Sequence, residues 1–418
     1  MTQAPHLESR LGDAAWLKQG DVARLLALLD REGEEARVVG GAVRNALARL
    51  PVDEVDVATT ALPGEVMRRV AAIGGETIPT GIEHGTVTVV FDHRPIEVTT
   101  LREDVETFGR KARVVFGRDW QADAMRRDFT INALSVSADG MVHDYVGGFD
   151  DIAARRVRFI GEPQRRIEED YLRILRFFRF HAHFGQGAPD PAGLLACIRS
   201  RAGLETLSRE RLRMEMLKLL VAARATPTLA VMAESGLLGI VLGGVAFLAS
   251  FENMTKVEAA LSAAPNAVRR LGALGVWVAE DAERLTQRLR LANAESEALS
   301  ALDGWWRVAP TQGDAAAHAL LYRLGPQAFA DRAFLAWSRA AGVGDGAWRD
   351  LAQLPQRWMA PAFPLNAEDF MRRGIAAGPM LGAALRVAEE AWIAADFPAD
   401  RAVLEAIAER AAQETVPP

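Results

Sequence analysis

Two acidic residues two positions apart, Glu54 and Asp56, are the first candidates for chemistry in this sequence. Val55 and Val57 alternate with them, so a strand here would place both carboxylates on one face and both valines on the other. Neighbouring carboxylates repel each other unless a cation neutralises them, and their hard oxygen atoms suit Mg²⁺. The pattern therefore predicts a magnesium site.

A third carboxylate, Glu97, stands inside the apolar run Ile96-Glu97-Val98, where a sheet would favour an uncharged residue. We expect Glu97 to lie on a strand next to Glu54 and Asp56. Three carboxylates on neighbouring strands can hold two metal ions, one activating an attacking hydroxyl and the other bound to a triphosphate. We predict catalytic and metal-binding roles for all three acids. The alternative for any one of them alone is a solvated strand edge.

A glycine pair, Gly40-Gly41, precedes these acids in the chain. The flanking residues 37–39 are typical of a short strand, and residues 42–50 of a helix that ends before Pro51. Absent side chains let a phosphate approach the backbone N–H groups at the positive end of a helix. Arg44, one turn further, could donate a charge-assisted bond to a triphosphate. A plain turn is the alternative.

The elements that must position these residues change in kind along the chain. Runs of β-branched residues predict strands at residues 55–58, 86–91, 96–101 and 130–136, with a hairpin turn through residues 92–95. Beyond about residue 150, apolar residues recur at three- and four-residue spacing, as in Leu172, Leu175 and Phe178, which is typical of packed amphipathic helices. The sequence therefore predicts an α+β protein with a mixed β-sheet followed by a helical remainder.

Composition narrows the class of protein. Half of the 418 residues are apolar, which is enough for a sizeable core, and Cys197 is the only cysteine, so no intrachain disulfide can form. The first residues lack the features of a signal peptide, and no apolar run is long enough to cross a bilayer. We expect a cytoplasmic protein with no membrane partner.

Charge gives a mixed indication about nucleic-acid binding. The net charge of -6 argues weakly against it, since proteins that bind phosphate backbones usually carry a basic face. Residues 155–179 nevertheless contain eight arginines against four acids. This stretch is either a contact surface for an anionic partner or a helical region with internal ion pairs.

Several motifs together resemble a known family. The segments VVGGAVRNAL and EVDVATTALP are similar to the first signature of the class II tRNA nucleotidyltransferases and bacterial poly(A) polymerases, members of the polymerase-beta-like superfamily. Further motifs follow in that family's order. They are GIEHGTVTV, RRDFTINAL, DYVGG, EDYLRILRFFRF and SRERLRMEMLKLL.

The resemblance implies a nucleotide site. It assigns nucleotide-binding roles to the RRDFTINAL residues Arg127, Asp128 and Asn132, with a carboxylate that accepts from the ribose 2′-OH. It also assigns base selection to a helix with Asp170 and Arg173, which at i and i+3 would share one face. Cytosine and adenine both present an amino donor beside a ring-nitrogen acceptor, so an Asp acceptor and an Arg donor match them.

The resemblance further implies an elongated arrangement of four domains. They are a nucleotidyltransferase head (residues 1–145), a neck that recognises the base (146–214), a helical body (215–303) and a helical tail that binds tRNA (304–418). The expected activity is addition of C and A from CTP and ATP to the 3′ end of tRNA, with release of pyrophosphate. The expected partners are the tRNA acceptor arm and the two nucleotides, with no obligate protein partner. The family uses the segment 102–117, which contains Glu106, Arg110 and Lys111, when it switches to A addition.

Two residues depart from the family pattern: Glu54 stands where many relatives carry Asp, and Asn45 stands where they usually carry Asp. Alternative functions are a poly(A) polymerase of the same family and an enzyme that adds only C or only A. From other classes, His143-Asp144 suggests a phosphohydrolase, and a catalytically silent RNA-binding module is the third possibility.

Overall fold

The computed structural model describes residues 11–92, 94–108, 111–340 and 346–415, and the side chains of these residues except 103–114. The chain divides into two compact units, Met1–Val241 and Leu242–Pro418. Within the described residues, no helix is both long and apolar enough to span a membrane.

The first unit is built on a seven-stranded sheet with the strand order β3-β4-β5-β2-β1-β8-β9. β2 and β5 are parallel, and every other neighbouring pair is antiparallel. The predicted mixed sheet is therefore confirmed. Its strands are β1 (Ala36–Val39), β2 (Asp56–Thr59), β3 (Glu76–Gly81), β4 (Thr86–Phe91), β5 (Arg94–Thr100), β8 (Ser135–Val136) and β9 (Val142–His143).

The predicted hairpin is confirmed as β4 and β5, which pair antiparallel from Thr86↔Thr99 to Phe91↔Arg94. Alternation explains the strands: on β5, Ile96 and Val98 are buried, whereas Glu97 between them is exposed. The central strands are apolar at Val38 and Val57, which are fully buried.

The predicted strand at residues 130–136 is wrong in its first half. Residues Thr130–Asn132 form a 3₁₀ turn, and only Ser135–Val136 extend as β8. The Thr130 hydroxyl donates to Asp151 Oδ2 at 2.6 Å, and the Asn132 amide donates to Asp128 Oδ1 at 3.1 Å. These two side-chain bonds hold Thr130 and Asn132 in the turn, despite the β-branched residues of the segment.

A second, two-stranded sheet consists of β6 (Arg102–Phe108) and β7 (Lys111–Phe116), which pair with each other alone among the described strands. It leaves the large sheet at Leu101, whose carbonyl accepts from Gly117 N–H at 2.8 Å. The segment 102–117 is therefore a hairpin. Arg110 lies outside the described residues, as do the side chains of Glu106 and Lys111.

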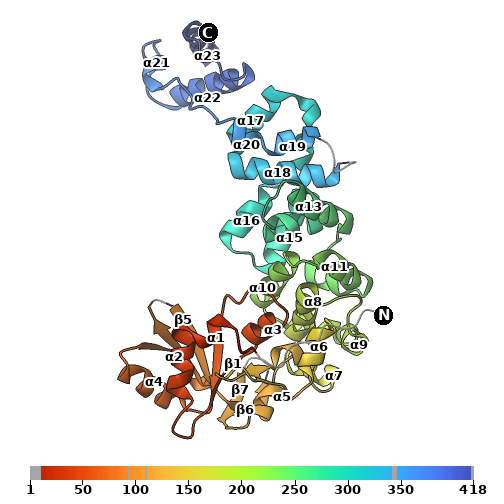
Figure 1. Ribbon diagram of the computed structural model, residues 1–418. Coiled ribbons are helices and arrows are strands. Elements are labelled where there is room, and N and C mark those ends of the chain that lie inside the picture. Colours follow the sequence, from red (N-terminus) through yellow and green to blue (C-terminus); the bar gives the residue numbers. More distant parts are fainter. Residues whose placement is uncertain (1–10, 93, 109–110, 341–345, 416–418) are drawn as a thin grey trace. The chain divides into compact units, whose positions relative to one another are not determined.

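Helices follow the sheet in the first unit, and the described residues after β9 contain no strand (Figure 1). An aromatic core joins the two regions: Phe129 contacts Phe159 at 4.8 Å and Phe177 at 6.2 Å between ring centroids. Phe177 belongs to the central helix α8 (Leu172–Phe184), which packs on α10 (Arg209–Leu220) and α11 (Ala225–Glu234). The core fixes α8 against the residues that follow Asp128.

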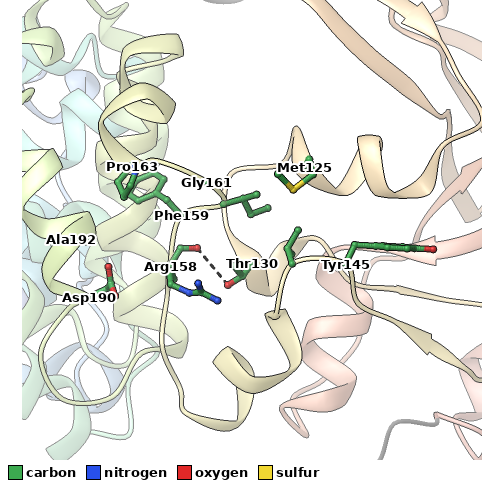
Figure 2. Close-up of a pocket in the computed structure, with 11 residues that line it drawn as sticks. Met125, Thr130, Tyr145, Arg158, Phe159, Gly161, Pro163, Asp190 and Ala192 are labelled. Carbon is green, nitrogen blue, oxygen red and sulfur yellow. Dashed lines mark hydrogen bonds between the residues drawn. The ribbon is translucent and has the colours of Figure 1, made fainter.

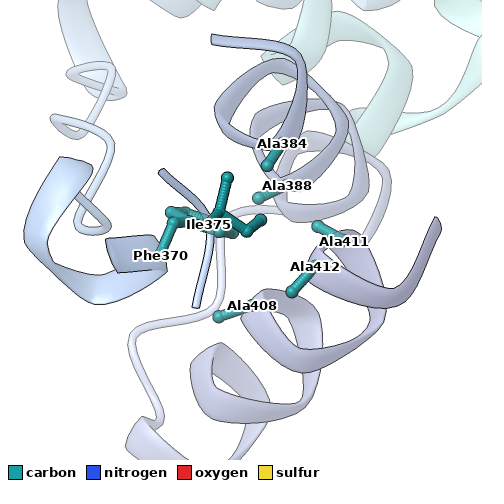
Figure 3. Close-up of a cluster of buried hydrophobic side chains, with 7 residues drawn as sticks. All are labelled: Phe370, Ile375, Ala384, Ala388, Ala408, Ala411 and Ala412. Atoms are coloured by element: carbon teal, nitrogen blue, oxygen red, sulfur yellow. The ribbon is translucent and has the colours of Figure 1, made fainter. Parts of the chain in front are cut away.

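The described part of the second unit is helical throughout. Its interior includes the helices α13 (Leu248–Ala260), α14 (Ala267–Gly275) and α18 (Pro326–Arg339), joined by a buried ion cluster of Arg269 and Arg270 with Glu258 and Asp331. Near the end of the chain, α22 (Pro379–Ala394) and α23 (Arg401–Thr415) pack closely through alanines, against which Phe370 and Ile375 lie (Figure 3).

Candidate active site

Asp56 and Glu97 lie directly opposite each other on the parallel strands β2 and β5. Both side chains are exposed, while their neighbours Val57 and Val98 are buried beneath the sheet. The expected placement of these two acids on adjacent strands is confirmed. Two carboxylates in register at the surface of a sheet form an oxygen-rich position of the kind that divalent cations occupy.

Glu54 lies before β2, whose first residue is Asp56, so the prediction that both belong to one strand is wrong. The strand begins late because Pro51 and the three charged residues within 53–56 disfavour strand pairing. The described residues contain no group of three or more His, Cys, Asp or Glu side chains placed to hold a metal ion. The structure thus brings together Asp56 and Glu97 and leaves Glu54 beside them.

Electrostatics at Asp56 favour a bound cation. Desolvation by the surrounding protein raises the pKa of Asp56 above its ordinary value, and the negative charges of Glu97 and Glu54 raise it further. The positive charge of Arg127 acts in the opposite direction. This mutual repulsion is relieved when a positive ion binds between the acids. The residues present therefore fit a divalent cation.

The glycine turn lies beside the acids, because Val39 of β1 pairs with Asp56 of β2 and Gly40 follows directly. Gly40 caps the N-terminus of α3 (Gly41–Leu47) with φ 68° and ψ -120°, a conformation that only glycine adopts readily. A Cβ atom there would lie 3.3 Å from Arg127 Nη1. Arg127 donates to Asn132 O at 3.2 Å and to Asp123 Oδ2, so its guanidinium is fixed next to the turn.

Arg44, for which we predict a bond to the triphosphate, is held by side chains of the protein, and its triphosphate contact stays a prediction. Its Nη1 donates to Asn132 Oδ1 at 2.5 Å, its Nε and Nη2 donate to Asn45 Oδ1, and its guanidinium lies over the Phe184 ring at 4.1 Å. Burial and the nearby Arg179 lower the pKa of Arg44 to about 10. In this structure Arg127 is the cation next to Gly40, and Arg44 links α3 to α8.

Asp128 is half-buried, and its carboxylate accepts three hydrogen bonds. Its Oδ1 accepts from Phe129 N–H at 2.9 Å and Asn132 Nδ2 at 3.1 Å, and its Oδ2 accepts from Arg176 Nε at 2.7 Å. Burial opposes ionisation, but the charge of Arg176 and these hydrogen bonds together hold the pKa of Asp128 below its ordinary value. The side chains of Asp128 and Asn132 are thus brought together, as the motif implied.

The predicted shared helix face of Asp170 and Arg173 is wrong. Asp170 is the C-cap of α7 (Pro163–Glu169) in an extended conformation, and a new helix, α8, begins at Leu172. Asp170 Oδ1 accepts from Leu172 N–H at 3.1 Å, so the carboxylate caps the start of α8. Aspartate is favoured at this position. Asp170 Oδ2 accepts from Arg211 Nη2 at 2.7 Å, whereas Arg173 donates to Glu169 Oε2 at 2.6 Å.

Six of the eight arginines in the stretch 155–179 form ion pairs. Only Arg166 and Arg173, which share Glu169, pair within the stretch, so the interpretation of a helical region with internal ion pairs is confirmed for these two alone. The partners are Asp151 for Arg156 and Arg158, Glu169 for Arg166 and Arg173, Asp128 for Arg176, and Glu215 for Arg179.

Sequence reasoning missed the residues that hold the predicted ones in place. Asp123 fixes Arg127, and Arg211 fixes Asp170. The i, i+4 spacing of Asp123 and Arg127 is a signal that could have identified the first pair. No local pattern indicates the second, because 41 residues separate its members.

A pocket of about 350 Å³ lies away from the predicted site residues, none of which lines it (Figure 2). It lies between the end of α5 (Trp120–Met125), Tyr145, the loop at Arg158 and the start of α9 (Pro191–Arg199). Its most prominent charge, Arg158, is paired with Asp151 at 2.9 Å. It belongs to the junction of the sheet with the helices.

The His143-Asp144 pair has a structural role, so the phosphohydrolase alternative is wrong. His143 lies on β9, where Nε2 contacts Ser137 Oγ at 3.1 Å. Asp144 accepts from the N–H groups of Val146, Gly147 and Phe149, which fixes the entry to α6 (Gly148–Ala153). Neither side chain belongs to a metal cluster in the described part of the chain.

Comparison with known proteins agrees with this geometry. A family model described as "Poly A polymerase head domain" matches residues 36–158, and one described as "Probable RNA and SrmB- binding site of polymerase A" matches residues 190–248. The chain is 32% identical to the human mitochondrial CCA tRNA nucleotidyltransferase 1 over 383 residues, which cover 88% of this chain and 85% of that protein. It is also 32% identical to the CCA-adding enzyme of Limosilactobacillus fermentum, over 86% of this chain and 89% of that protein.

Solved structures give the same result. The CCA-adding enzyme of Bacillus stearothermophilus in complex with CTP superposes with a TM-score of 0.76 at 29% identity, covering 94% of this chain and 97% of that one. The sheet, the glycine turn and the paired acids define a nucleotidyltransferase fold. The chain belongs to the family of class II tRNA nucleotidyltransferases and bacterial poly(A) polymerases.

Proposed function

We propose that this protein is a CCA-adding enzyme, which transfers C and A from CTP and ATP to the 3′ end of tRNA without a nucleic-acid template and releases pyrophosphate. The observation that carries the proposal is the parallel register of Asp56 and Glu97 beside the Gly40 turn. Curated relatives that match over most of both chains are named for CCA addition.

The reaction would be attack of the RNA 3′-hydroxyl on the α-phosphate of the nucleoside triphosphate. The N–H groups at the start of α3 and the guanidiniums of Arg127 and Arg44 would bind the triphosphate. A Cβ atom at Gly40 would lie 3.3 Å from Arg127 Nη1, and one at Gly41 would lie 3.7 Å from Arg44 Nη2. Asp56 and Glu97 would orient the reacting groups. No covalent enzyme intermediate is required.

Asp56 and Glu97, with Glu54 as a third acid, would hold a divalent cation, for which we propose Mg²⁺. When bound, the cation would lower the pKa of the attacking hydroxyl and neutralise charge that develops on the phosphate. The repulsion that raises the pKa of Asp56 supports this assignment.

Base choice would belong to Asp170 and Arg173, which flank the break between α7 and α8. Each is held by a neighbour of opposite charge, Arg211 and Glu169 respectively. An incoming cytosine or adenine would offer the donor and acceptor that these groups need. Uracil and guanine would leave buried groups unpaired, at roughly 1–3 kcal/mol each.

The division into head, neck, body and tail is also part of this proposal. The sheet and α8 would act on the nucleotide, and the helices of the second unit would bind the acceptor arm. One solved structure with this fold is a Thermotoga maritima CCA-adding enzyme complexed with tRNA. We further propose the cytosol as its compartment, because Cys197, the single cysteine, is a free thiol.

The test is incubation of the purified protein with Mg²⁺, ATP and CTP and a tRNA that ends at its discriminator base. We expect addition of three nucleotides, two C and one A. Long tails of A alone would contradict the proposal and favour a poly(A) polymerase. Addition that stops after C, or that requires a tRNA already ending in CC, would identify a partial enzyme.

A further inference from the structure

The carboxylate of Asp128 is held by three hydrogen bonds and an ion pair. Phe129 N–H and Asn132 Nδ2 donate to Oδ1, and Arg176 Nε donates to Oδ2 at 2.7 Å, while Arg176 Nη2 lies 2.6 Å from the same oxygen as an ion-pair contact. A carboxylate offers about four lone-pair positions, so Oδ2 can accept one further hydrogen bond, from a ribose hydroxyl.

Arg176 is the residue that holds Oδ2. The backbone N–H of Phe129 and the side chain of Asn132 both donate to Oδ1. Arg176 donates to Oδ2 through Nε, so it can keep this oxygen in place while the second lone pair of the oxygen accepts from a hydroxyl. The remaining nitrogen of Arg176, Nη1, lies 3.8 Å from Glu215 Oε1.

All three guanidinium nitrogens of Arg176 therefore face carboxylates, which argues against a role in binding phosphate or reading a base. The arginine comes from α8, whereas Asp128 precedes the 3₁₀ turn Thr130–Asn132 of the sheet region. From Asp128 the contacts continue through Asn132 to Arg44 on α3, the helix that starts at the glycine turn. The ion pair thus connects the proposed base-reading helix with the proposed triphosphate turn.

We propose that Arg176 is a positioning residue for sugar selection: it orients Asp128 and shares it with the ribose 2′-hydroxyl, so that ribonucleotides are preferred over deoxyribonucleotides. The inference rests on the proposed function, in which Asp128 lies at the ribose. Arg176 itself touches no part of the nucleotide.

Arg179 provides a matched control. It lies one turn further along α8, and it pairs with Glu215 at 2.5 Å, which is the second acid of Arg176. Like Arg176, it also lies over the Phe180 ring. Arg176 bonds to Asp128, whereas Arg179 bonds to Glu215.

The experiment measures the affinity of the full chain for ATP and for 2′-deoxy-ATP by calorimetry, in the wild type and in Arg176→Gln, Arg176→Lys and Arg179→Gln. We expect the wild type to prefer ATP, and Arg176→Gln to reduce that preference by about tenfold or more, as loss of a charged hydrogen bond does. Arg176→Lys keeps the charge and can still donate to Asp128 from its single nitrogen, so it should retain part of the preference. Arg179→Gln should retain all of it.

The inference would be overturned if Arg176→Gln kept the ATP preference of the wild type, or if Arg179→Gln lost as much of it. It would also be overturned if the wild type bound ATP and 2′-deoxy-ATP equally. If Arg176→Gln fails to fold, the comparison of Arg176→Lys with the wild type decides, because the lysine leaves Asp128 paired. Binding is measured without RNA. A wild type that prefers ATP but adds nothing to tRNA would therefore contradict the proposed function and leave this inference standing.

Discussion

At the scale of residues, Asp56 shows a conflict between stability and function. The side chain is open to solvent, yet its surroundings and the charges of Glu97 and Glu54 raise its pKa. A carboxyl group whose pKa is higher in the folded than in the unfolded protein binds protons better when folded. Ionisation of Asp56 therefore destabilises the fold, and this destabilisation grows as the pH rises from the ordinary pKa of the group towards its raised pKa in the folded protein.

We accordingly predict that Asp56→Asn raises the melting temperature of the metal-free protein at pH 7, and that this gain shrinks as the pH falls towards 4. Calorimetry in the presence of a chelator measures both. Asp53→Asn is the control, because Asp53 is an exposed acid in the same segment for which we propose no ligand role. A lower melting temperature of Asp56→Asn at pH 7 would contradict the repulsion.

Gly40 carries the second prediction at this scale. Because its φ is 68° and a Cβ would approach Arg127, Gly40→Ala should lower the free energy of unfolding by about 1–3 kcal/mol. It should also weaken ATP binding. The matched change Gly41→Ala has room, since its Cβ would lie 3.7 Å from Arg44 Nη2, so chemical denaturation should show little change. Equal effects of the two substitutions would count against a special turn.

At the scale of elements, the break between α7 and α8 positions the proposed base-reading pair. Asp170 uses Oδ1 to cap α8 and Oδ2 to bind Arg211. Asn at this position keeps an oxygen for the cap but replaces the other oxygen with a donor. Asp170→Asn combined with Arg173→Gln should therefore relax base choice while α8 stays folded.

We expect the double variant to lose about ten- to a hundredfold of its preference for CTP and ATP over UTP and GTP, measured as relative incorporation into tRNA. Asp190→Asn, at the N-cap of α9, controls for the change of a capping residue. If the double variant still rejects UTP and GTP as the wild type does, base choice lies elsewhere.

Local patterns predicted the elements near the acids well, but they could not supply the pairings. Alternation around Glu97 and the β-branched run before it indicated β4 and β5, yet the parallel pairing of Asp56 with Glu97 joins residues 41 positions apart. The same reason explains why the break at Asp170 was not predicted. The sequence there looks like one continuous helix, but Asp170 ends α7, caps α8 and bonds to Arg211. The strand predicted at residues 130–136 failed because side-chain bonds of Thr130 and Asn132 outweigh strand propensity.

At the scale of the whole molecule, the two compact units differ in how far the sequence could describe them. All the motifs that identified the family lie in Met1–Val241. Leu242–Pro418 was predicted only as helices, because helix packing through small residues such as Ala384 and Ala408 leaves no motif with a chemical meaning. Its proposed contact with tRNA consequently rests on the family and on chain-wide similarity to the B. stearothermophilus enzyme.

The central claim is that Asp56 and Glu97 form the catalytic centre of a nucleotidyltransferase. The most direct test is incorporation of labelled CTP and ATP into tRNA by Asp56→Asn, with Glu97→Gln in parallel and Asp53→Asn as control. We predict that both active-site variants bind nucleotide but lose incorporation by about a thousandfold or more, since metal-assisted charge stabilisation contributes several kcal/mol. Undiminished incorporation by Asp56→Asn would contradict the account.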